Sequence, residues 1–157
     1  MILSTGAVVK QAISFPGQLP ARSLEETLAA PGKRAALMPY LMGGFPDLAT
    51  SRQIGEACIE SGADVIELGV PFSDPLADGP VIHSAATRAL AAGATLEGVL
   101  ELAAELANEI PVVVMCYANV VLARGAEAFA GALKDSGASG AIVPDLPIEA
   151  SSELLAA

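Results

Sequence analysis

The sequence is short of the residues on which many binding sites depend. It contains no tryptophan, and aromatic residues make up 4% of the chain, which leaves few rings for stacking against nucleic-acid bases. Eight basic residues stand against eighteen acidic ones, which gives a net charge of −10 at pH 7. Such a charge repels phosphate backbones and anionic membrane surfaces. We therefore expect neither nucleic acid nor a membrane as a partner.

Thiol and imidazole groups are also scarce. Cys58 and Cys116 have neither metal-type nor redox-type spacing, and the single histidine, His83, has no partner at ligand spacing. We interpret all three as structural residues, and we expect no disulfide and a reducing, cytoplasmic location. No apolar run approaches the ~20 residues that span a bilayer. No G-x-G-x-x-G motif follows the first predicted strand, which disfavours a dinucleotide-binding domain.

The remaining composition favours one globular α/β domain. Hydrophobic residues make up 53% of the 157 residues, enough to form a buried core. We interpret residues 1–22 as a leader of uncertain order and residues 23–157 as the domain. Within the domain, the similar segments Glu60-Ser-Gly-Ala63 and Asp135-Ser-Gly-Ala138 each precede a short apolar strand and a proline-bearing loop. This repetition predicts parallel β/α units, with all loops that follow strands on one edge of the sheet.

The expected elements follow from apolar runs and their punctuation. Gly62 stands where a left-handed helix cap is needed, and Pro80 suits a first helical turn. The predicted strands cover residues 35–42, 64–68, 111–116 and 140–143. The predicted helices cover residues 23–30, 46–61, 80–92, 96–108 and 126–136, and a further helix begins at Glu149.

The longest strand-to-helix loop, residues 69–79, follows one carboxylate and has a second near its end. Alternation along the preceding strand places Glu67 on the face opposite Ile66 and Leu68. A carboxylate at the end of a buried strand should have a raised pKa, which would make Glu67 a candidate general acid. Asp78 lies at the end of the loop and could share the acid and base roles. From these residues alone, a solvated rim glutamate and an ordinary Asp-Gly-Pro turn are the more common explanation of the pattern.

The stretch from Glu67 to Pro80, Glu-Leu-Gly-Val-Pro-Phe-Ser-Asp-Pro-Leu-Ala-Asp-Gly-Pro, resembles the signature loop of the tryptophan synthase alpha subunit family. The similarity extends through Gly44-Phe-Pro-Asp47, Cys116-Tyr-Ala-Asn119 and Pro144-Asp-Leu-Pro147, and covers the chain from about Ser23 onward. It implies a TIM (β/α)8 barrel, of which about the first four β/α units are present. It also implies a lyase of tryptophan biosynthesis that cleaves indole-3-glycerol phosphate to indole and glyceraldehyde 3-phosphate by a retro-aldol reaction.

The resemblance also implies roles for individual positions. Glu67 matches the acid that protonates the indole carbon bearing the side chain, and Asp78 matches the base near the ring nitrogen. The positions that match an apolar slot around the indole are Tyr40, Ile82, Met115 and Tyr117. Tyr40 stands where the family often has phenylalanine. Core packing alone would also account for these four residues.

A partner is implied as well. The positions that match the surface facing the beta subunit are Pro71, Asp74, Asn119 and Pro147, for which turn formation is the simpler explanation. The resemblance implies no metal and no cofactor in this chain. Pyridoxal phosphate is expected in the beta subunit, within an alpha2beta2 heterotetramer.

The chain departs from the family in length. A barrel of this kind needs about 250 residues and eight strands, whereas four strands are predicted here. From four units alone we expect little or no turnover, because the carboxylates would lack substrate positioning, and we favour a partial sequence. Two alternatives stay open: a noncatalytic module that binds the beta subunit, and another β/α-barrel enzyme that acts on a phosphorylated sugar.

Overall fold

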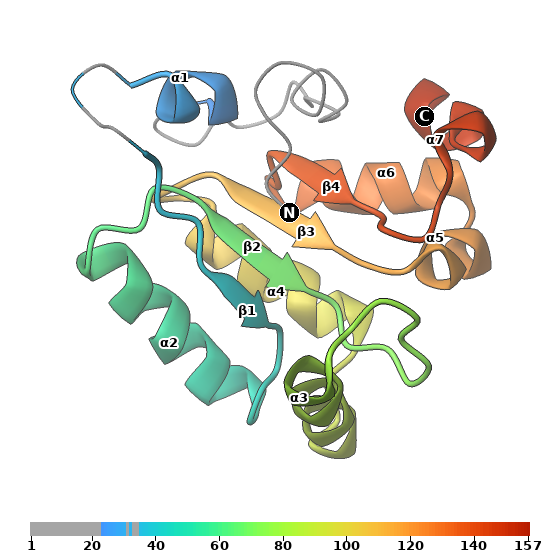
Figure 1. Ribbon diagram of the computed structural model, residues 1–157, viewed down its shortest axis with the longest axis horizontal. Coiled ribbons are helices and arrows are strands. Elements are labelled where there is room, and N and C mark those ends of the chain that lie inside the picture. The colour runs from blue at the N-terminus through green and yellow to red at the C-terminus, as the bar shows by residue number, and fades with distance from the viewer. Residues whose placement is uncertain (1–22, 31, 33–34) are drawn as a thin grey trace.

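The computed structural model describes residues 23–30, 32 and 35–157 (Figure 1). Its centre is a four-stranded parallel sheet in the order β1-β2-β3-β4, in which each strand pairs with its neighbour in sequence. The strands are β1 Tyr40–Met42, β2 Ile66–Gly69, β3 Val112–Met115 and β4 Gly140–Ile142. The predicted parallel β/α units are therefore confirmed. The leader predicted for residues 1–22 lies outside the described residues.

Helices follow the strands along the chain and cover the sheet. In Figure 1, α4 lies behind the sheet, and it contacts α2, α6 and β3. Helix α3 instead packs against β1. The helices are α1 Leu24–Leu28, α2 Leu48–Glu60, α3 Pro80–Ala91, α4 Leu96–Leu106, α5 Ala118–Arg124, α6 Ala126–Asp135, the 3-10 helix η2 Ile148–Ala150 and α7 Ser152–Ala156. No described helix has the length and apolar character needed to cross a membrane.

Local sequence signals set the helix ends. The Asp47 side chain accepts a hydrogen bond from the Thr50 amide at 2.8 Å and so caps α2. Past the other end of α2, Gly62 has a φ of +93°, a conformation that glycine adopts without steric cost. Pro80 occupies the first turn of α3, where its missing N–H leaves no helical bond unmade.

The first strand is shorter than predicted. Only residues 40–42 of the predicted run 35–42 are paired as a strand, and Leu37 and Met38 are exposed rather than buried. Pro39 explains part of the difference, because proline has no N–H to donate to a neighbouring strand. The Pro39 carbonyl still accepts a bond from the Glu67 amide at 3.0 Å, so the chain follows β2 without forming a regular ladder there.

Helix α5 was not predicted. Its seven residues directly follow β3 and end at Gly125, which has a φ of +85°. The Asp145 carboxylate accepts a hydrogen bond from the Ala118 amide at 2.8 Å, in the first turn of this helix. A tertiary contact from the loop after β4 therefore satisfies an N–H that a short helix would otherwise leave unpaired.

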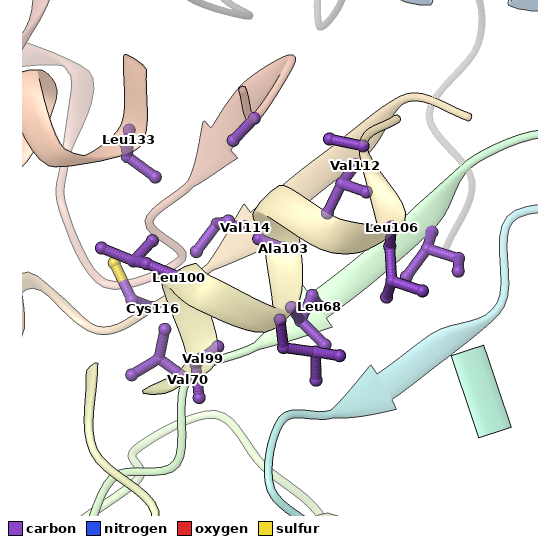
Figure 2. Close-up of a cluster of buried hydrophobic side chains, with 14 of the residues drawn as sticks. Leu68, Val70, Val99, Leu100, Ala103, Leu106, Val112, Val114, Cys116 and Leu133 are labelled. Atoms are coloured by element: carbon purple, nitrogen blue, oxygen red, sulfur yellow. The ribbon is translucent and has the colours of Figure 1, made fainter. Parts of the chain in front are cut away.

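The main core lies between the sheet and the helices that cover it. Ile66 and Leu68 of β2 are fully buried in this cluster. Leu68 lies near α4 side chains such as Leu106 (Figure 2). Cys116 belongs to the same cluster, and burial raises the pKa of its thiol to about 12. Such a thiol stays protonated at neutral pH and is unreactive.

Candidate functional site

Strand β2 directs its carboxylate away from the main core. Glu67 pairs in register with Tyr40 of β1 and Val113 of β3, on the face opposite Ile66 and Leu68. Its side chain is half-buried, and burial raises the pKa of the carboxyl above the usual value of 4.5. A carboxyl in this environment keeps its proton to higher pH than an exposed glutamate, which is the property a general acid needs.

The Tyr40 side chain runs along the same face toward the carboxyl end of β2. A Cβ added to Gly69 would lie 2.1 Å from the Tyr40 hydroxyl, so the tyrosine occupies the space beside this glycine. Burial raises the pKa of the Tyr40 phenol, and the charges of Asp78 and Glu67 raise it further. The charges of both predicted acid–base residues therefore act on the Tyr40 hydroxyl.

Tyr117 fastens the long loop that carries Asp78. The Ala77 amide donates a hydrogen bond to the Tyr117 hydroxyl at 3.1 Å, and the rings of Phe72 and Tyr117 lie 5.5 Å apart. Burial raises the pKa of Tyr117, and a hydrogen bond with the Asp78 side chain contributes in the same direction. Contacts from Phe72 and Ala77 thus hold the loop that carries Asp78 against Tyr117, just after the carboxyl end of β3.

An apolar cavity of about 190 Å³ adjoins this polar group. Tyr40 forms part of its wall together with Ile82, from the first turns of α3. The guanidinium of Arg88, also on α3, lies 4.9 Å from the centre of the Phe45 ring, which lines the cavity as well. The full lining is Tyr40, Leu41, Met42, Phe45, Ser51, Ile54, Ile82 and Ala85.

The predicted slot residues therefore fall into two groups. Tyr40 and Ile82 line the cavity, whereas Tyr117 faces the loop and Met115 does not line the cavity. Met115 is buried in β3, in register with Gly69 and Ile142. A larger hollow of about 560 Å³ lies beside α5, α6 and α7 and contains none of the predicted site residues.

The four residues predicted to face a partner lie in the segments that follow three successive strands, with Asn119 in the first turn of α5. Asp74, Asn119 and Pro147 are exposed, whereas Pro71 is buried. Because parallel strands end on one edge of a sheet, the three exposed residues share the edge at which Glu67 and Asp78 lie. The Ser73 hydroxyl donates a hydrogen bond to the Asp74 carboxylate, so this part of the loop has its own local order.

Sequence reasoning missed two residues of the site. Asp145 was noted only for its place in a loop, yet its carboxylate binds the Ala118 amide and its charge contributes to the raised pKa of Tyr117. The internal repetition could have identified it, since Asp145 and Glu67 follow equivalent acid-Ser-Gly-Ala segments. Gly69 was read only as a loop residue, but it makes room for Tyr40. In the described part of the chain, no three His, Cys, Asp or Glu side chains are grouped to hold a metal ion.

Known proteins are similar to this chain in sequence and in fold. The family model "Tryptophan synthase alpha chain" matches residues 27–157. The tryptophan synthase alpha chain of Synechococcus elongatus is 54% identical over 123 residues, which cover 77% of this chain and 46% of that protein. The chain spans about half the length of the curated relatives it matches.

Solved structures agree with the sequence relatives. A crystal structure of tryptophan synthase from Mycobacterium tuberculosis matches with a TM-score of 0.74 and 42% identity, over 78% of this chain and 50% of that one. Tryptophan synthase subunit alpha from Legionella pneumophila matches with a TM-score of 0.72 and 38% identity, over 76% and 47%. The parallel sheet and its helices correspond to part of a TIM barrel in these proteins, and the chain belongs to the tryptophan synthase alpha chain family.

Proposed function

We propose that residues 23–157 form the amino-terminal half of a barrel that cleaves indole-3-glycerol phosphate to indole and glyceraldehyde 3-phosphate. The observation that carries this proposal is the half-buried Glu67, whose pKa is raised by burial and whose charge, like that of Asp78, raises the pKa of the Tyr40 phenol. Two carboxylates in different surroundings can divide acid and base work between them. The adjoining apolar cavity, with Tyr40 and Ile82 in its wall, offers a surface for a flat aromatic ring.

In the proposed reaction, Glu67 gives its proton to the indole carbon that bears the side chain. The ring then carries positive charge, and the Asp78 carboxylate stabilises it at the ring N–H. The bond from the ring to the side chain breaks, its electron pair returns to the ring, and the adjacent hydroxyl becomes the aldehyde as its proton passes to the Glu67 carboxylate. Proton donation in such a step contributes typically 10²- to 10⁴-fold in rate.

Tyr117 and Met115 are proposed to complete the wall around the ring. Tyr117 is buried and holds the loop of Asp78 through the Ala77 amide, so it would fix the distance between the base and the ring. Met115 lies two residues beyond Val113, the β3 partner of Glu67, and so on the same face of the sheet as Glu67, where a flexible apolar side chain can adapt to a ligand.

The exposed segments at the same edge are proposed to face a beta subunit. Asp74, Asn119 and Pro147 would contact it directly, and the buried Pro71 would act by shaping the loop. In this proposal the pyridoxal phosphate belongs to the beta subunit, in an alpha2beta2 assembly, and this chain contributes the indole. The phosphate of the substrate would be bound by barrel units beyond the four described, where such barrels usually hold phosphate.

A chimera tests the proposal. Residues 27–157 would replace the matching part of the Synechococcus elongatus alpha chain, and indole release from indole-3-glycerol phosphate would be measured with purified protein. We expect the chimera to be active and Glu67→Gln to lower its kcat by at least about 100-fold. The matched control Glu101→Gln changes an exposed glutamate on α4 and should stay within about twofold of the parent.

Three outcomes are informative. A parent rate retained in Glu67→Gln would contradict the assignment of the acid. A folded chimera that binds a beta subunit but releases no indole would favour the noncatalytic binding module. A folded chimera that cleaves a different phosphorylated sugar would favour the other β/α-barrel enzyme.

A further inference from the structure

The carboxylate of Asp145, in the segment that follows β4, holds the chain at the point where it leaves β3. It accepts a hydrogen bond from the Ala118 amide at 2.8 Å. We propose that Asp145 is a positioning residue, which fixes Tyr117 and, through it, the loop that carries Asp78. The proposal deepens the function given above and rests on it for the role of Asp78.

Tyr117 stands between two hydrogen bonds that join the chain to the β4 side of the sheet. Before it, the Cys116 amide donates to the Ile142 carbonyl at 3.0 Å, at the end of the ladder between β3 and β4. After it, the Ala118 amide donates to the Asp145 carboxylate. With the first bond alone, the backbone could still rotate about the two soft dihedral angles of Tyr117. The second bond fixes the direction in which the chain leaves the sheet, and therefore the place of the Tyr117 ring.

The Tyr117 ring is the surface against which the long loop packs. The ring is buried and contacts the loop at two points: its centre lies 5.5 Å from that of the Phe72 ring, and its hydroxyl accepts a hydrogen bond from the Ala77 amide at 3.1 Å. Asp78 directly follows Ala77, so the place of the ring determines where this part of the loop lies. Catalysis is sensitive to such placement, since a shift of about 1 Å can cost about 10²-fold in rate.

A second aspartate makes the same kind of bond at the opposite edge of the sheet. Asp64, just before β2, accepts a hydrogen bond from the Leu37 amide at 2.8 Å. In both bonds the partners are 27 residues apart in the sequence. We therefore expect the two bonds to make similar contributions to stability, whereas only that of Asp145 lies at the edge where the loop of Asp78 begins. Asp64 is thus a control that separates positioning from a general loss of stability.

The contact between the Phe72 and Tyr117 rings reports the position of the loop in the 157-residue chain. A nuclear Overhauser effect between protons of the two rings would be measured and assigned with Phe72→Leu. We expect this effect to be lost in Asp145→Ala and kept in Asp64→Ala. A ring contact that persists in Asp145→Ala, or that is lost in both variants, would overturn the proposal.

Kinetics in the chimera test the consequence for catalysis. We expect Asp145→Ala to lower kcat about tenfold while KM stays within about twofold, because the substrate still binds but the base is displaced. Asp145→Asn keeps an oxygen acceptor and should stay within about threefold of the parent kcat, and Asp64→Ala within about twofold. An unchanged kcat in Asp145→Ala, or an equal loss in either of the other two variants, would overturn the proposal.

A change at the donor decides the case in which Asp145→Ala does not fold. Ala118 is the first residue of α5, and Tyr117 before it has a φ of −81° and a ψ of 152°, so a proline fits at position 118. Ala118→Pro removes the N–H and should lower kcat as much as Asp145→Ala, whereas a parent-like kcat would overturn the proposal. If the parent chimera releases no indole, the proposed function fails, and the ring contact in the 157-residue chain still decides whether Asp145 holds the loop.

Discussion

Strand β2 presents two different surfaces within four residues. Ile66 and Leu68 point to the helices and are fully buried among aliphatic side chains. Glu67 and Gly69 point to the other face, where a carboxylate, a phenol and a cavity are found. The alternation of a strand is sufficient to separate the residues that stabilise the fold from those proposed to carry the chemistry.

The polar face of β2 is tolerated because the opposite face of the same strand is aliphatic and buried. Placing a carboxylate where its ionised form is poorly solvated reduces stability, and the aliphatic face of the same strand offsets that loss. Neighbouring strands follow the same rule, since Val112 and Val114 of β3 belong to the helix-side core. Changes on the two faces should therefore have different consequences, the larger effects on stability being expected from the helix side.

The largest expected difference in stability is between neighbouring residues. Leu68→Ala removes a fully buried side chain and should lower the free energy of unfolding by about 3 kcal/mol. Glu67→Ala removes a half-buried carboxylate and should lower it by less than about 1 kcal/mol. Urea unfolding of both variants, followed by circular dichroism, checks the contrast, and equal losses would mean that the two faces are not distinct.

A smaller effect is expected where the polar face is tightly packed. Gly69→Ala would place a methyl group 2.1 Å from the Tyr40 hydroxyl and should cost about 2 kcal/mol of stability. The same change made with Tyr40→Ala should cost much less than the sum of the two. Gly131→Ala is the control, because its methyl group meets nothing within 4 Å and it lies inside α6, where alanine is the better helix former. An additive double variant would contradict the contact.

Removing one oxygen from the loop anchor should have a local effect. Tyr117→Phe deletes the acceptor of the Ala77 amide and should cost about 1 kcal/mol. Hydrogen exchange at Ala77 should become faster, while the Ala118 amide, held by Asp145, keeps its rate. Unchanged exchange at Ala77 would show that Tyr117 does not hold the loop.

The smallest effects concern pH. Glu67 has a raised pKa in the folded state, so the stability it contributes is present below 4.5 and is lost as the pH rises through the folded pKa. Glu67→Gln should therefore gain stability relative to the parent as the pH rises above 4.5. Glu97→Gln should show the opposite trend, because a hydrogen bond from Arg124 lowers the Glu97 pKa, although its exposure keeps the effect small. The free energy of unfolding of each variant and of the parent would be measured at pH 4 and at pH 7. A variant whose stability changes between the two pH values by the same amount as that of the parent would contradict its assignment.

Most of the fold could be predicted because its signals are local. Apolar runs, Gly62 and Pro80 identified the parallel units and most helix boundaries. Helix α5 was missed because seven residues carry a weak helical signal, and its first turn depends on Asp145 from a distant loop. The strand at 35–42 was overextended because Leu37 and Met38 are apolar, yet Pro39 interrupts the ladder.

The candidate site was predicted less completely than the fold. Alternation identified the face of Glu67, and the loop composition drew attention to Asp78. The positions of Tyr40 beside Gly69 and of Tyr117 beneath Ala77 depend on strand register and loop closure, which no local pattern encodes. The family roles of these residues came from the resemblance and stay predictions.

A site-resolved titration of Glu67 tests the central claim most directly. The ¹³C signal of its carboxyl carbon, assigned with Glu67→Gln, would be followed in the 157-residue chain as the pH is raised. A midpoint above 4.5 is expected, because burial on the polar face of β2 disfavours the charged form. A midpoint at or below 4.5 would mean that this carboxyl is well solvated or paired, and Glu67 would then lack the property on which its role as proton donor depends.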